Sequence, residues 1–339
     1  MATIKDVAKL ANVSVTTVSI IINGKSEERK ISSATQEKVF DAMKQLGYQP
    51  NLIARRLRSQ DSRRPVIAFF WPVDYRTPIL ASFLNSLQLE AKKIGFDCEL
   101  VIQTYENDKL EQYDSSILKN GYNGIIVGAC SQKDLTYLEN LSPKVPLILI
   151  NRESQSFSTV CTDQKEIGFL AARQFRLRGY TEAVVFSTYH SYVATGLRTQ
   201  AFLYACSQLG INVASEHIFR GPSTIEGGFY IAEQYCQLDS PPKIIFCDSD
   251  TMAIGALNAF HKHRIKIPDD VEILTIAMLE PENTKYSVPS LSVIEMPNHE
   301  ISKQVVHLLR DKISGNTIEP THIILDAALV LRESFRGVY

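Results

Sequence analysis

The chain lacks any apolar run long enough to cross a bilayer. A transmembrane helix needs about 20 consecutive apolar residues, and runs such as Val66–Trp71 are far shorter. The N-terminal sequence MATIKDVAKL also lacks the uninterrupted apolar segment of a secretory signal, because it carries charges at Lys5, Asp6 and Lys9. We therefore expect a protein that stays in the cytoplasm.

Cysteine is sparse, and the motifs of common enzymes are missing. The six cysteines are scattered, with no C-x-x-C pair and no clustered histidine, a pattern typical of buried reduced thiols. There is no G-x-S-x-G, no Walker loop, and no G-x-G-x-x-G after a strand. His261 and His263 are two residues apart on an expected helix, so they point in different directions. We predict no enzyme activity, no cofactor and no metal site.

The charge is divided unevenly along the 339 residues. The composition, with 45% hydrophobic and 22% charged residues, is that of a globular protein with sizeable cores. Residues 1–64 hold 12 Lys+Arg and 6 Asp+Glu, whereas the remainder holds 24 and 31. The net charge of -1 thus conceals a basic N-terminal module on an acidic body.

The pattern of the first 48 residues predicts three helices. Thr3 and Asp6 form a capping-box pattern at the start of the first helix, and Ser14 is placed to cap a second one after a tight turn. A third helix begins at a Ser32 or Ser33 cap and ends at Gly47. This spacing indicates a helix-turn-helix, although a generic three-helix bundle would show the same pattern.

Three motifs in order resemble those of the lactose-repressor/galactose-repressor family of bacterial transcription regulators. They are TIKDVAKLANVSVTTVS, ISSATQEKV and GYQPNLIARRL. The resemblance implies a second helix that enters the major groove of an operator, followed by a hinge helix that pushes Leu57 into the minor groove. A core position in the linker is the alternative for Leu57. The domains expected are residues 1–48 for the helix-turn-helix and 49–64 for the hinge helix and linker.

The family's DNA contacts can be carried over by matching position. Base-facing positions of the second helix would be Val15, Thr16, Ser19 and Ile20. Phosphate contacts would come mostly from Thr3, Ser14, Thr17, Asn23, Ser32 and Thr35. The hinge would contribute Asn51, Ala54, Arg55 and Leu57.

Ile20 departs from the family pattern. Most members have Arg at this position, and Arg can bind guanine O6 and N7 in a bidentate manner. Ile20 cannot do so, and with Val15 it makes the reading surface apolar and suited to thymine methyl groups. We therefore predict an operator unlike the commonest family consensus.

Beyond residue 64, short apolar runs alternate with helical patterns. Expected strands include Val66–Phe70, Gly124–Val127, Leu147–Ile150 and Val271–Ile276, with helices such as Ile79–Ile94 between them. This alternation is typical of parallel sheets covered by helices on both faces. Residues 65–339 are too many for one small doubly wound domain, so two sheets facing each other across a cleft are expected.

The body resembles the periplasmic-binding-protein-like (type I) sensor of the same family. The matching segments include GLRTQAF, DSDTMAIGAL and LVLRES. The resemblance implies effector binding and dimerisation over 65–339, in two lobes between which the chain crosses three times. We place the first lobe at about 65–161 plus 292–322 and the second at about 162–291 plus 323–339.

The resemblance also implies a set of effector-binding positions. They are Asp74, Arg76, Asn151, Arg152, Arg198, Ser223, Asp250 and Ala277. A structural ion pair remains the alternative for Arg198, and helix capping the alternative for Asp250. Ala277 stands where many sugar-responsive members have Asp, and Ser223 where several have an aromatic ring. The arginines could therefore favour a phosphorylated sugar or another anion over a neutral sugar.

Together these features predict a DNA-binding transcription regulator, most simply a repressor of a carbohydrate-utilisation operon. A sugar or sugar phosphate in the cleft would control it, and a homodimer would bind a pseudo-palindromic operator of double-stranded DNA. A catabolite-control type with a protein corepressor stays open. A solute-binding protein and an enzyme with a DNA-binding arm are the alternatives from other classes.

Overall fold

A computed structural model describes residues 4–22, 26, 28–46, 64–74, 76–119, 121–189, 193–279, 281–317 and 319–337. It divides the chain into a compact N-terminal unit up to Arg63 and a larger unit that runs from Arg64 to the C-terminus, apart from 119–121. Among the described helices, none is both long and apolar enough to cross a membrane.

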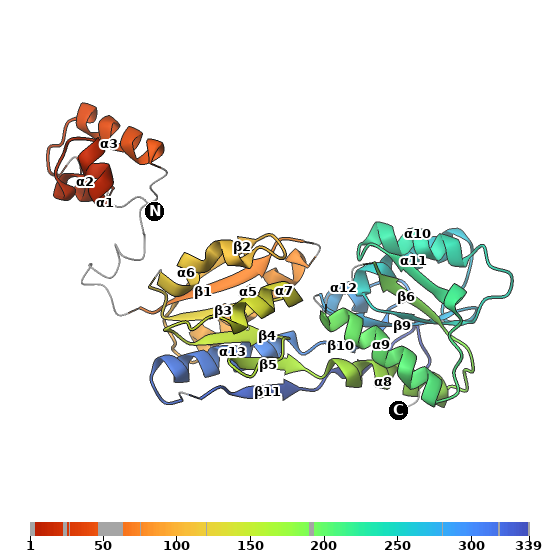
Figure 1. Cartoon of the computed structure of the whole chain (residues 1–339). Helices are drawn as coiled ribbons and strands as arrows, with labels where there is room; N and C mark the ends of the chain where they lie inside the picture. The colour runs from red at the N-terminus through yellow and green to blue at the C-terminus, as the bar shows by residue number, and fades with distance from the viewer. Residues whose placement is uncertain are drawn as a thin grey trace. The chain divides into compact units, whose positions relative to one another are not determined.

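The described part of the N-terminal unit contains the three predicted helices, α1 (Ile4–Leu10), α2 (Val15–Ile22) and α3 (Ser33–Gln45) (Figure 1). Their core contains one fully buried valine from each helix, Val7, Val18 and Val39. Hydrophobic spacing at i, i+3 and i+4 places these side chains on the inner faces. The small helices are therefore held together by one shared apolar contact region.

Hydroxyl caps set where α2 and α3 begin. The Thr17 backbone N–H donates to Ser14 Oγ at 3.0 Å, and Thr35 N–H donates to Ser32 Oγ at 3.3 Å. Ser32, rather than Ser33, is thus the cap of α3. Asn12 takes a positive φ of 53° in the turn before α2, a conformation that Asn tolerates better than most residues.

The larger unit contains two six-stranded sheets (Figure 1). In the first sheet the order is β11-β5-β4-β3-β1-β2, and all its pairings are parallel. Its strands are β1 (Val66–Pro72), β2 (Glu99–Tyr105), β3 (Gly124–Gly128), β4 (Leu147–Ile150), β5 (Ser158–Thr162) and β11 (His322–Leu325). Its helices are α5 (Thr77–Lys93), α6 (Asp114–Lys119), α7 (Gln132–Glu139) and α13 (Asn298–Ile313), with a 3₁₀ turn at Leu110–Tyr113.

The second sheet has the order β12-β10-β9-β8-β6-β7, in which only the edge strand β12 is antiparallel. Its strands are β6 (Val184–Thr188), β7 (Ile218–Gly221), β8 (Ile244–Cys247), β9 (Glu272–Ala277), β10 (Ser292–Glu295) and β12 (Ala328–Val330). Its helices are α8 (Gln164–Leu177), α9 (Val193–Gln208), α10 (Ile225–Tyr235), α11 (Asp250–Lys262) and α12 (Pro281–Lys285), with a 3₁₀ turn at Ser215–His217.

Burial follows from this architecture. Strands β1, β3, β4, β6, β8 and β9 are buried at every residue. Parallel sheets are covered by their crossover helices on both faces, so their strands are continuous apolar runs rather than alternating ones. The parallel sheets covered by helices, predicted from the alternating pattern, are confirmed.

The predicted lobe boundaries are wrong near the C-terminus. We placed 292–322 in the first lobe, but β10 pairs with β9 in the second sheet. We placed 323 onward in the second lobe, but β11 pairs with β5 in the first. Strands of four residues carry no signal that assigns them to a sheet, because the pairing partner is far away in sequence. The chain crosses between lobes after β5, before α13 and between β11 and β12.

A glycine allows α8 and α9 to approach closely. A Cβ placed on Gly168 would lie 2.5 Å from both the Arg198 carbonyl oxygen and the Phe202 nitrogen. Both atoms belong to the backbone of α9, which cannot move aside as a side chain can. Gly168 therefore fixes the distance between α8 and the helix that carries Arg198.

We expect Gly168→Ala to lower the free energy of unfolding by about 1–3 kcal/mol, since overpacking forces backbone shifts. The better helix propensity of Ala, about 1 kcal/mol, offsets part of this loss. Urea denaturation measures the change, with Lys165→Ala at an exposed position of the same helix as the control. A Gly168→Ala protein as stable as the wild type would show that the two helices separate without cost.

Candidate functional site

The outward face of α2 carries no charge. Val15 is 41% exposed and Thr16 is exposed, while Ser19 and Ile20 are half-buried. The opposite face, with Val18 and Ile21, is buried in the three-helix core. The four positions expected to face bases thus share the side of α2 that the core leaves open, a surface of hydroxyls and aliphatic groups.

The hydroxyls expected to contact phosphate lie at helix N-termini. Ser14 and Thr17 are joined by a side-chain hydrogen bond of 2.8 Å, as are Ser32 and Thr35. Helix N-termini attract anions because their backbone N–H groups point outward and the helix dipole is positive there. The other expected DNA contacts lie outside the described residues: Thr3, Asn23, Asn51, Ala54, Arg55 and Leu57.

Four of the expected effector-binding residues line one cavity between the lobes. Arg76, Asn151 and Arg152 come from the first lobe, and Arg198 comes from α9 of the second. The remaining lining residues are Trp71, Ile79, Phe83, Ala129, Ile150, Met278, Met296 and Asn298. The carboxyl ends of parallel strands meet at one edge of a sheet, which explains how distant residues converge here.

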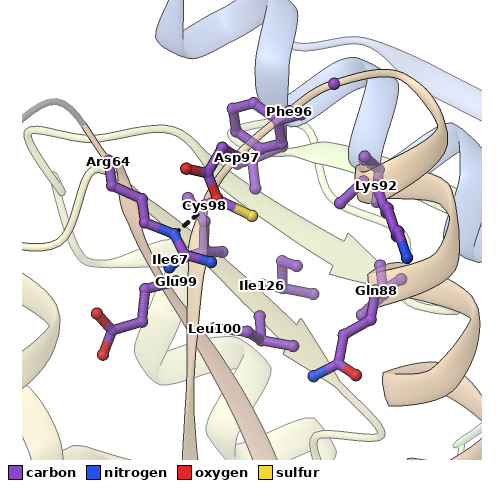
Figure 2. Close-up of a pocket in the computed structure, with 15 residues that line it drawn as sticks. Arg64, Ile67, Gln88, Lys92, Phe96, Asp97, Cys98, Glu99, Leu100 and Ile126 are labelled. Atoms are coloured by element: carbon purple, nitrogen blue, oxygen red, sulfur yellow. Dashed lines mark ion pairs between the residues drawn. The ribbon is translucent and has the colours of Figure 1, made fainter.

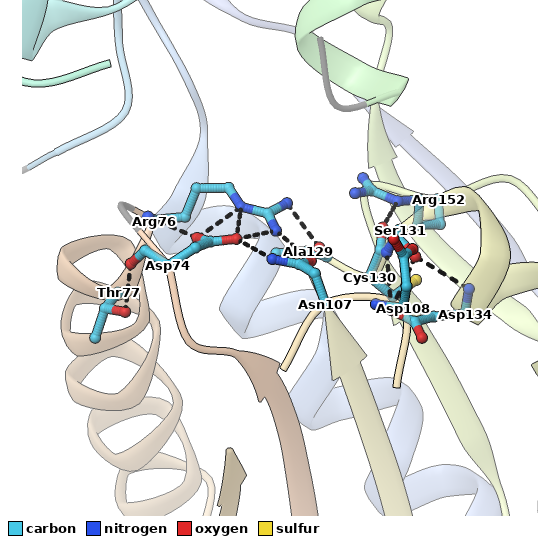
Figure 3. Close-up of polar contacts among 10 residues, drawn as sticks. All are labelled: Asp74, Arg76, Thr77, Asn107, Asp108, Ala129, Cys130, Ser131, Asp134 and Arg152. Carbon is cyan, nitrogen blue, oxygen red and sulfur yellow. Dashed lines mark hydrogen bonds and ion pairs between the residues drawn. The ribbon is translucent and has the colours of Figure 1, made fainter. Parts of the chain in front are cut away.

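Arg76 and Asp74 form a closed polar network (Figure 3). Arg76 Nε donates to Asp74 Oδ1 at 3.0 Å and Nη1 donates to the Ala129 carbonyl at 2.7 Å. Asn107 Nδ2 donates to Asp74 Oδ2 at 2.6 Å. Burial opposes ionisation of Asp74, but the bonds and charge of Arg76, with Asn107, outweigh it and lower its pKa. Asp74 thus acts on the cavity through Arg76.

Arg152 and Arg198 are the most deeply buried polar groups of the cavity, at 4% and 1% exposure. Arg152 Nε donates to the Cys130 carbonyl and Nη1 to the Asn151 carbonyl, both at 2.6 Å. Arg198 Nε donates to Gln164 Oε1, and Nη1 contacts Met278 Sδ at 3.3 Å. Gln164 begins α8 and Met278 follows β9, so Arg198 links three elements of the second lobe.

Asp250, Ser223 and Ala277 do not line the cavity. Asp250 Oδ2 accepts from the backbone N–H groups of Met278 and Leu279 at 3.0 and 2.9 Å, which supports a structural role for its carboxylate. Ser223 Oγ donates to Ser249 Oγ. Ala277 is buried in the core under the second sheet.

Sequence reasoning missed several cleft residues. Trp71 and Thr162, near the carboxyl ends of β1 and β5, have a buried Nε1 and Oγ1 respectively without a hydrogen-bond partner. Met278 and Asn298 line the cavity from the loop after β9 and the start of α13. Position at the carboxyl end of a buried strand was the only signal that could have identified Trp71.

The central cavity is small, at about 50 Å³. A second cavity of about 230 Å³ adjoins it, because Asn151 and Arg152 line both. Small-molecule sites typically measure about 300–1,000 Å³. Each of the two cavities is smaller than this range.

A larger hollow of about 500 Å³ lies elsewhere in the first lobe (Figure 2). Arg64 and Asp97 pair at 2.8 Å near the amino ends of β1 and β2, and Figure 2 shows this ion pair among the lining residues. The hollow is thus at the opposite edge of the sheet from the cleft. None of the expected effector-binding residues lines it.

Among the residues that the structure describes, no group of three His, Cys, Asp or Glu side chains could hold a metal ion. The six cysteines are free; Cys130, Cys161, Cys206 and Cys247 are buried, as predicted, whereas Cys98 and Cys236 are only partly buried. Burial raises the pKa of the Cys206 thiol to about 12.

Among the described residues, Asp248 is the only buried aspartate with a carboxylate oxygen that lacks a hydrogen-bond partner. Its charged neighbour is the cleft arginine Arg198. Its Oδ2 accepts from Ser187 Oγ at 2.8 Å and Thr188 N–H at 3.1 Å, while Oδ1 has no partner. Burial raises its pKa to about 6, against the opposing effect of these bonds and of Arg198.

Two family models match the chain. The model described as bacterial regulatory proteins, lacI family, matches residues 3–51. The model described as a periplasmic binding protein-like domain matches residues 172–335. The first match covers the three-helix unit, and the second covers every strand of the second sheet together with α13 and β11 of the first lobe.

Named relatives and solved structures match along most of the chain. It is 29% identical over 339 residues to the probable HTH-type transcriptional repressor ExuR of Bacillus subtilis, with 99% of each chain covered. A LacI family transcription regulator from Clostridium acetobutylicum is 32% identical, with a TM-score of 0.77 and coverage of 79% of this chain and 100% of that one. The lac repressor dimer bound to operator and the anti-inducer ONPF is 20% identical, with a TM-score of 0.71 and 98% of each chain covered.

The raised pKa of Asp248 predicts a pH dependence of stability. The unfolded aspartate ionises near pH 3.9, whereas the folded one ionises at about 6. The contribution of Asp248 to stability should therefore fall as the pH rises from 4 to 6, because the folded state then holds a buried carboxylate. Relative to the wild type, Asp248→Asn should gain on the order of 2 kcal/mol over this interval.

Denaturant unfolding at pH values from 4 to 7 measures this difference. Asp239→Asn, at an exposed aspartate, controls for the change in net charge. A difference between Asp248→Asn and wild type that stays constant with pH would show that Asp248 ionises alike in both states.

Proposed function

The chain belongs to the lacI family of bacterial regulatory proteins, and we propose that it acts in the cytoplasm as a dimeric repressor controlled by a sugar or sugar phosphate. It is a sequence-specific DNA-binding transcription regulator and not an enzyme. One observation carries the proposal: a helix with an open, hydroxyl-bearing face and a cleft lined by arginines occur in one chain. The first suits DNA, and the second suits a small polar effector.

On the DNA side, α2 would lie in the major groove with its open face toward base edges. Val15 and Ile20 would contact thymine methyl groups, and Thr16 and Ser19 would hydrogen-bond to bases. The caps Ser14 and Ser32, with Thr17 and Thr35, would meet phosphates at helix N-termini. Residues 49–64 would form the hinge that bends the operator, with Asn51, Ala54, Arg55 and Leu57 in the minor groove.

A homodimer is supported by an apolar surface on α10 and α11. Ile225 and Tyr230 are 54% and 58% exposed, and with Phe229, Ile254 and Asn258 they line a shallow groove between the two helices. The related lac repressor binds its operator as a dimer. Two reading helices must fall about one DNA turn apart, so a two-fold dimer implies a pseudo-palindromic operator.

On the effector side, we propose Arg76, Asn151, Arg152 and Arg198 as the contact residues, with Asp74 and Asp250 positioning them. Many relatives have Asp at the position of Ala277, and several have an aromatic ring at the position of Ser223. The effector of this protein would therefore lack contacts with that carboxylate and that ring. The effector would bind one of two forms of the cleft, open or closed, more tightly than the other, and so shift the population toward that form. That shift would change the spacing of the hinge helices and hence operator affinity.

The operator prediction is tested by selecting bound sequences from random DNA duplexes with the full-length protein. We expect half-sites unlike the commonest family consensus, with thymines opposite Val15 and Ile20. Ile20→Arg should gain a preference for guanine at one position in each half-site, because a bidentate contact discriminates by about 1–3 kcal/mol. Recovery of the same sequences by both proteins would show that Ile20 does not face a base.

The dimer prediction is tested by sedimentation. Tyr230→Asp should raise the dimer dissociation constant at least 10-fold, since it replaces an exposed aromatic with a charge at an apolar interface. Tyr204→Asp is the matched control, because Tyr204 is 59% exposed on α9. Equal dissociation constants for both variants and wild type would place the dimer interface on another surface.

A further inference from the structure

The hollow of about 500 Å³ in the first lobe has no part in the proposed function (Figure 2). Its volume falls within the range of about 300–1,000 Å³ that is typical of small-molecule sites. Both cleft cavities are smaller than this hollow. The hollow therefore has room for a second ligand, apart from the effector in the cleft.

The floor of the hollow is made of buried aliphatic side chains from four elements. Ile67 of β1, Leu87 of α5 and Ile126 of β3 are each at most 3% exposed. Helix α13 adds Val306 and Leu309. All five belong to the apolar core of the first lobe. The hollow thus connects that core with the surface, and its floor suits the apolar body of a ligand.

Charged side chains stand at the mouth of the hollow. Arg64 Nε pairs with Asp97 Oδ1 at 2.8 Å. Figure 2 shows the carboxylate of Glu99 directed away from Ile126 on the floor. Lys92, near the end of α5, is exposed, and its side chain has neither an ion pair nor a hydrogen bond within the described part of the chain. Lys92 therefore supplies an uncompensated positive charge beside an apolar floor.

This arrangement suits a small molecule better than the surface of a protein partner. Protein interfaces place apolar residues at the centre of the contact surface and polar residues at its rim. Here the residues at the surface, Arg64, Gln88, Lys92 and Asp97, are exposed and polar, whereas the apolar residues lie beneath them. A narrow molecule reaches the floor and leaves its polar end at the mouth.

We propose that the hollow binds a small amphipathic carboxylate. Its apolar chain or ring lies on the floor, and its carboxylate meets the Lys92 ammonium group. A charge-assisted bond of this kind selects an anion over an amine with the same apolar body. The inference goes beyond the proposed function, which assigns the effector to the cleft.

The hollow adjoins two segments through which a ligand can act on regulation. Ile67 lies at the start of β1, and residues 49–64, the expected hinge and linker, directly precede that strand. Helix α13 begins at Asn298, which lines the smaller cleft cavity. We expect a ligand that packs against both elements to change operator affinity. This consequence rests on the proposed function, whereas binding to the hollow does not.

The first experiment measures the melting temperature of the full-length protein with four compounds: octanoate, phenylbutyrate, acetate and octylamine. We expect octanoate or phenylbutyrate to raise the melting temperature with saturation, since a ligand bound by the folded state stabilises it by mass action. Acetate lacks the apolar body, and octylamine has the opposite charge. No rise with either amphipathic carboxylate overturns the proposal, as does an equal rise with acetate or octylamine.

The second experiment uses Cys98, which lines the hollow and is partly buried. Modification by N-ethylmaleimide is followed by peptide mass spectrometry. With octanoate at about ten times its dissociation constant, Cys98 should react about 10-fold more slowly, because only the free protein reacts. Cys236, which is partly buried and does not line the hollow, is the internal control and should react at an unchanged rate.

Two results of this experiment would contradict the proposal. One is a Cys98 rate that octanoate leaves unchanged. The other is a Cys98 that does not react even without octanoate, since the hollow would then admit no molecule of this size.

A charge variant tests the contact at the mouth. Lys92→Gln should weaken octanoate binding about 2- to 5-fold in calorimetric titrations, the loss expected for an exposed ion pair. Lys93→Gln is the matched control, because Lys93 does not line the hollow and its ammonium lies 3.5 Å from Glu90. Equal affinities for the two variants would remove Lys92 from the site.

A second variant fills the hollow. Ala91 is a lining residue, so the ring of Ala91→Phe should occupy the space of the ligand and abolish octanoate binding. Ala81→Phe, at an exposed position of the same helix, is the control. Circular dichroism verifies that both variants fold, and the Cys98 experiment decides without them. Undiminished octanoate binding by folded Ala91→Phe would place the ligand elsewhere.

Operator binding with and without octanoate separates the levels of inference. If the protein selects no DNA sequence, the repressor assignment fails, whereas the Cys98 and Lys92 results still decide the site. If octanoate protects Cys98 but leaves operator affinity unchanged, the site stands and its regulatory role fails.

Discussion

The parallel direction of the strands is the constraint on which the cleft depends. In a parallel sheet all carboxyl ends lie at one edge, so Trp71, Arg76 and Arg152 are brought together although 81 residues separate the first from the last. The same rule in the second sheet places Asp248 and Met278 after neighbouring strands β8 and β9. Functional side chains therefore collect at the ends of the strands, while strands such as β1, β3 and β4 are built mainly of apolar residues.

Close packing of helices fixes the position of these side chains. Gly168 permits α8 to touch the α9 backbone at Arg198, and Arg198 in turn contacts Gln164 at the start of α8. Asp250 holds the loop at Met278 through two backbone N–H groups. A shift of any one of these elements moves the others, which is the kind of coupling that a change in lobe closure requires.

Much of the architecture was predictable, because the spacing of apolar residues along the chain indicates which side chains are buried. The helices of the N-terminal unit and strands such as β1, β3 and β4 follow from apolar spacing alone. Strand β5 was missed, since Ser158–Thr162 is rich in polar side chains although every residue is buried. The sheet membership of β10 and β11 was wrong, because four-residue strands are assigned by partners far away in the chain. Of the expected effector positions, Arg76, Asn151 and Arg152 line the cavity from segments that follow strands, and Arg198 lines it from α9.

Local sequence by itself determined the caps at Ser14 and Ser32, the uncharged face of α2 and the alternation that builds two parallel sheets. These properties depend on neighbours within one helical turn or one strand. Tertiary structure alone decided that Arg152 is buried beside the Cys130 carbonyl and close to polar atoms that lack partners. The reason is that the cost of a buried charge depends on what surrounds it in space, and the surroundings of Arg152 come from strands β1, β4 and β5 and from the segment after β3.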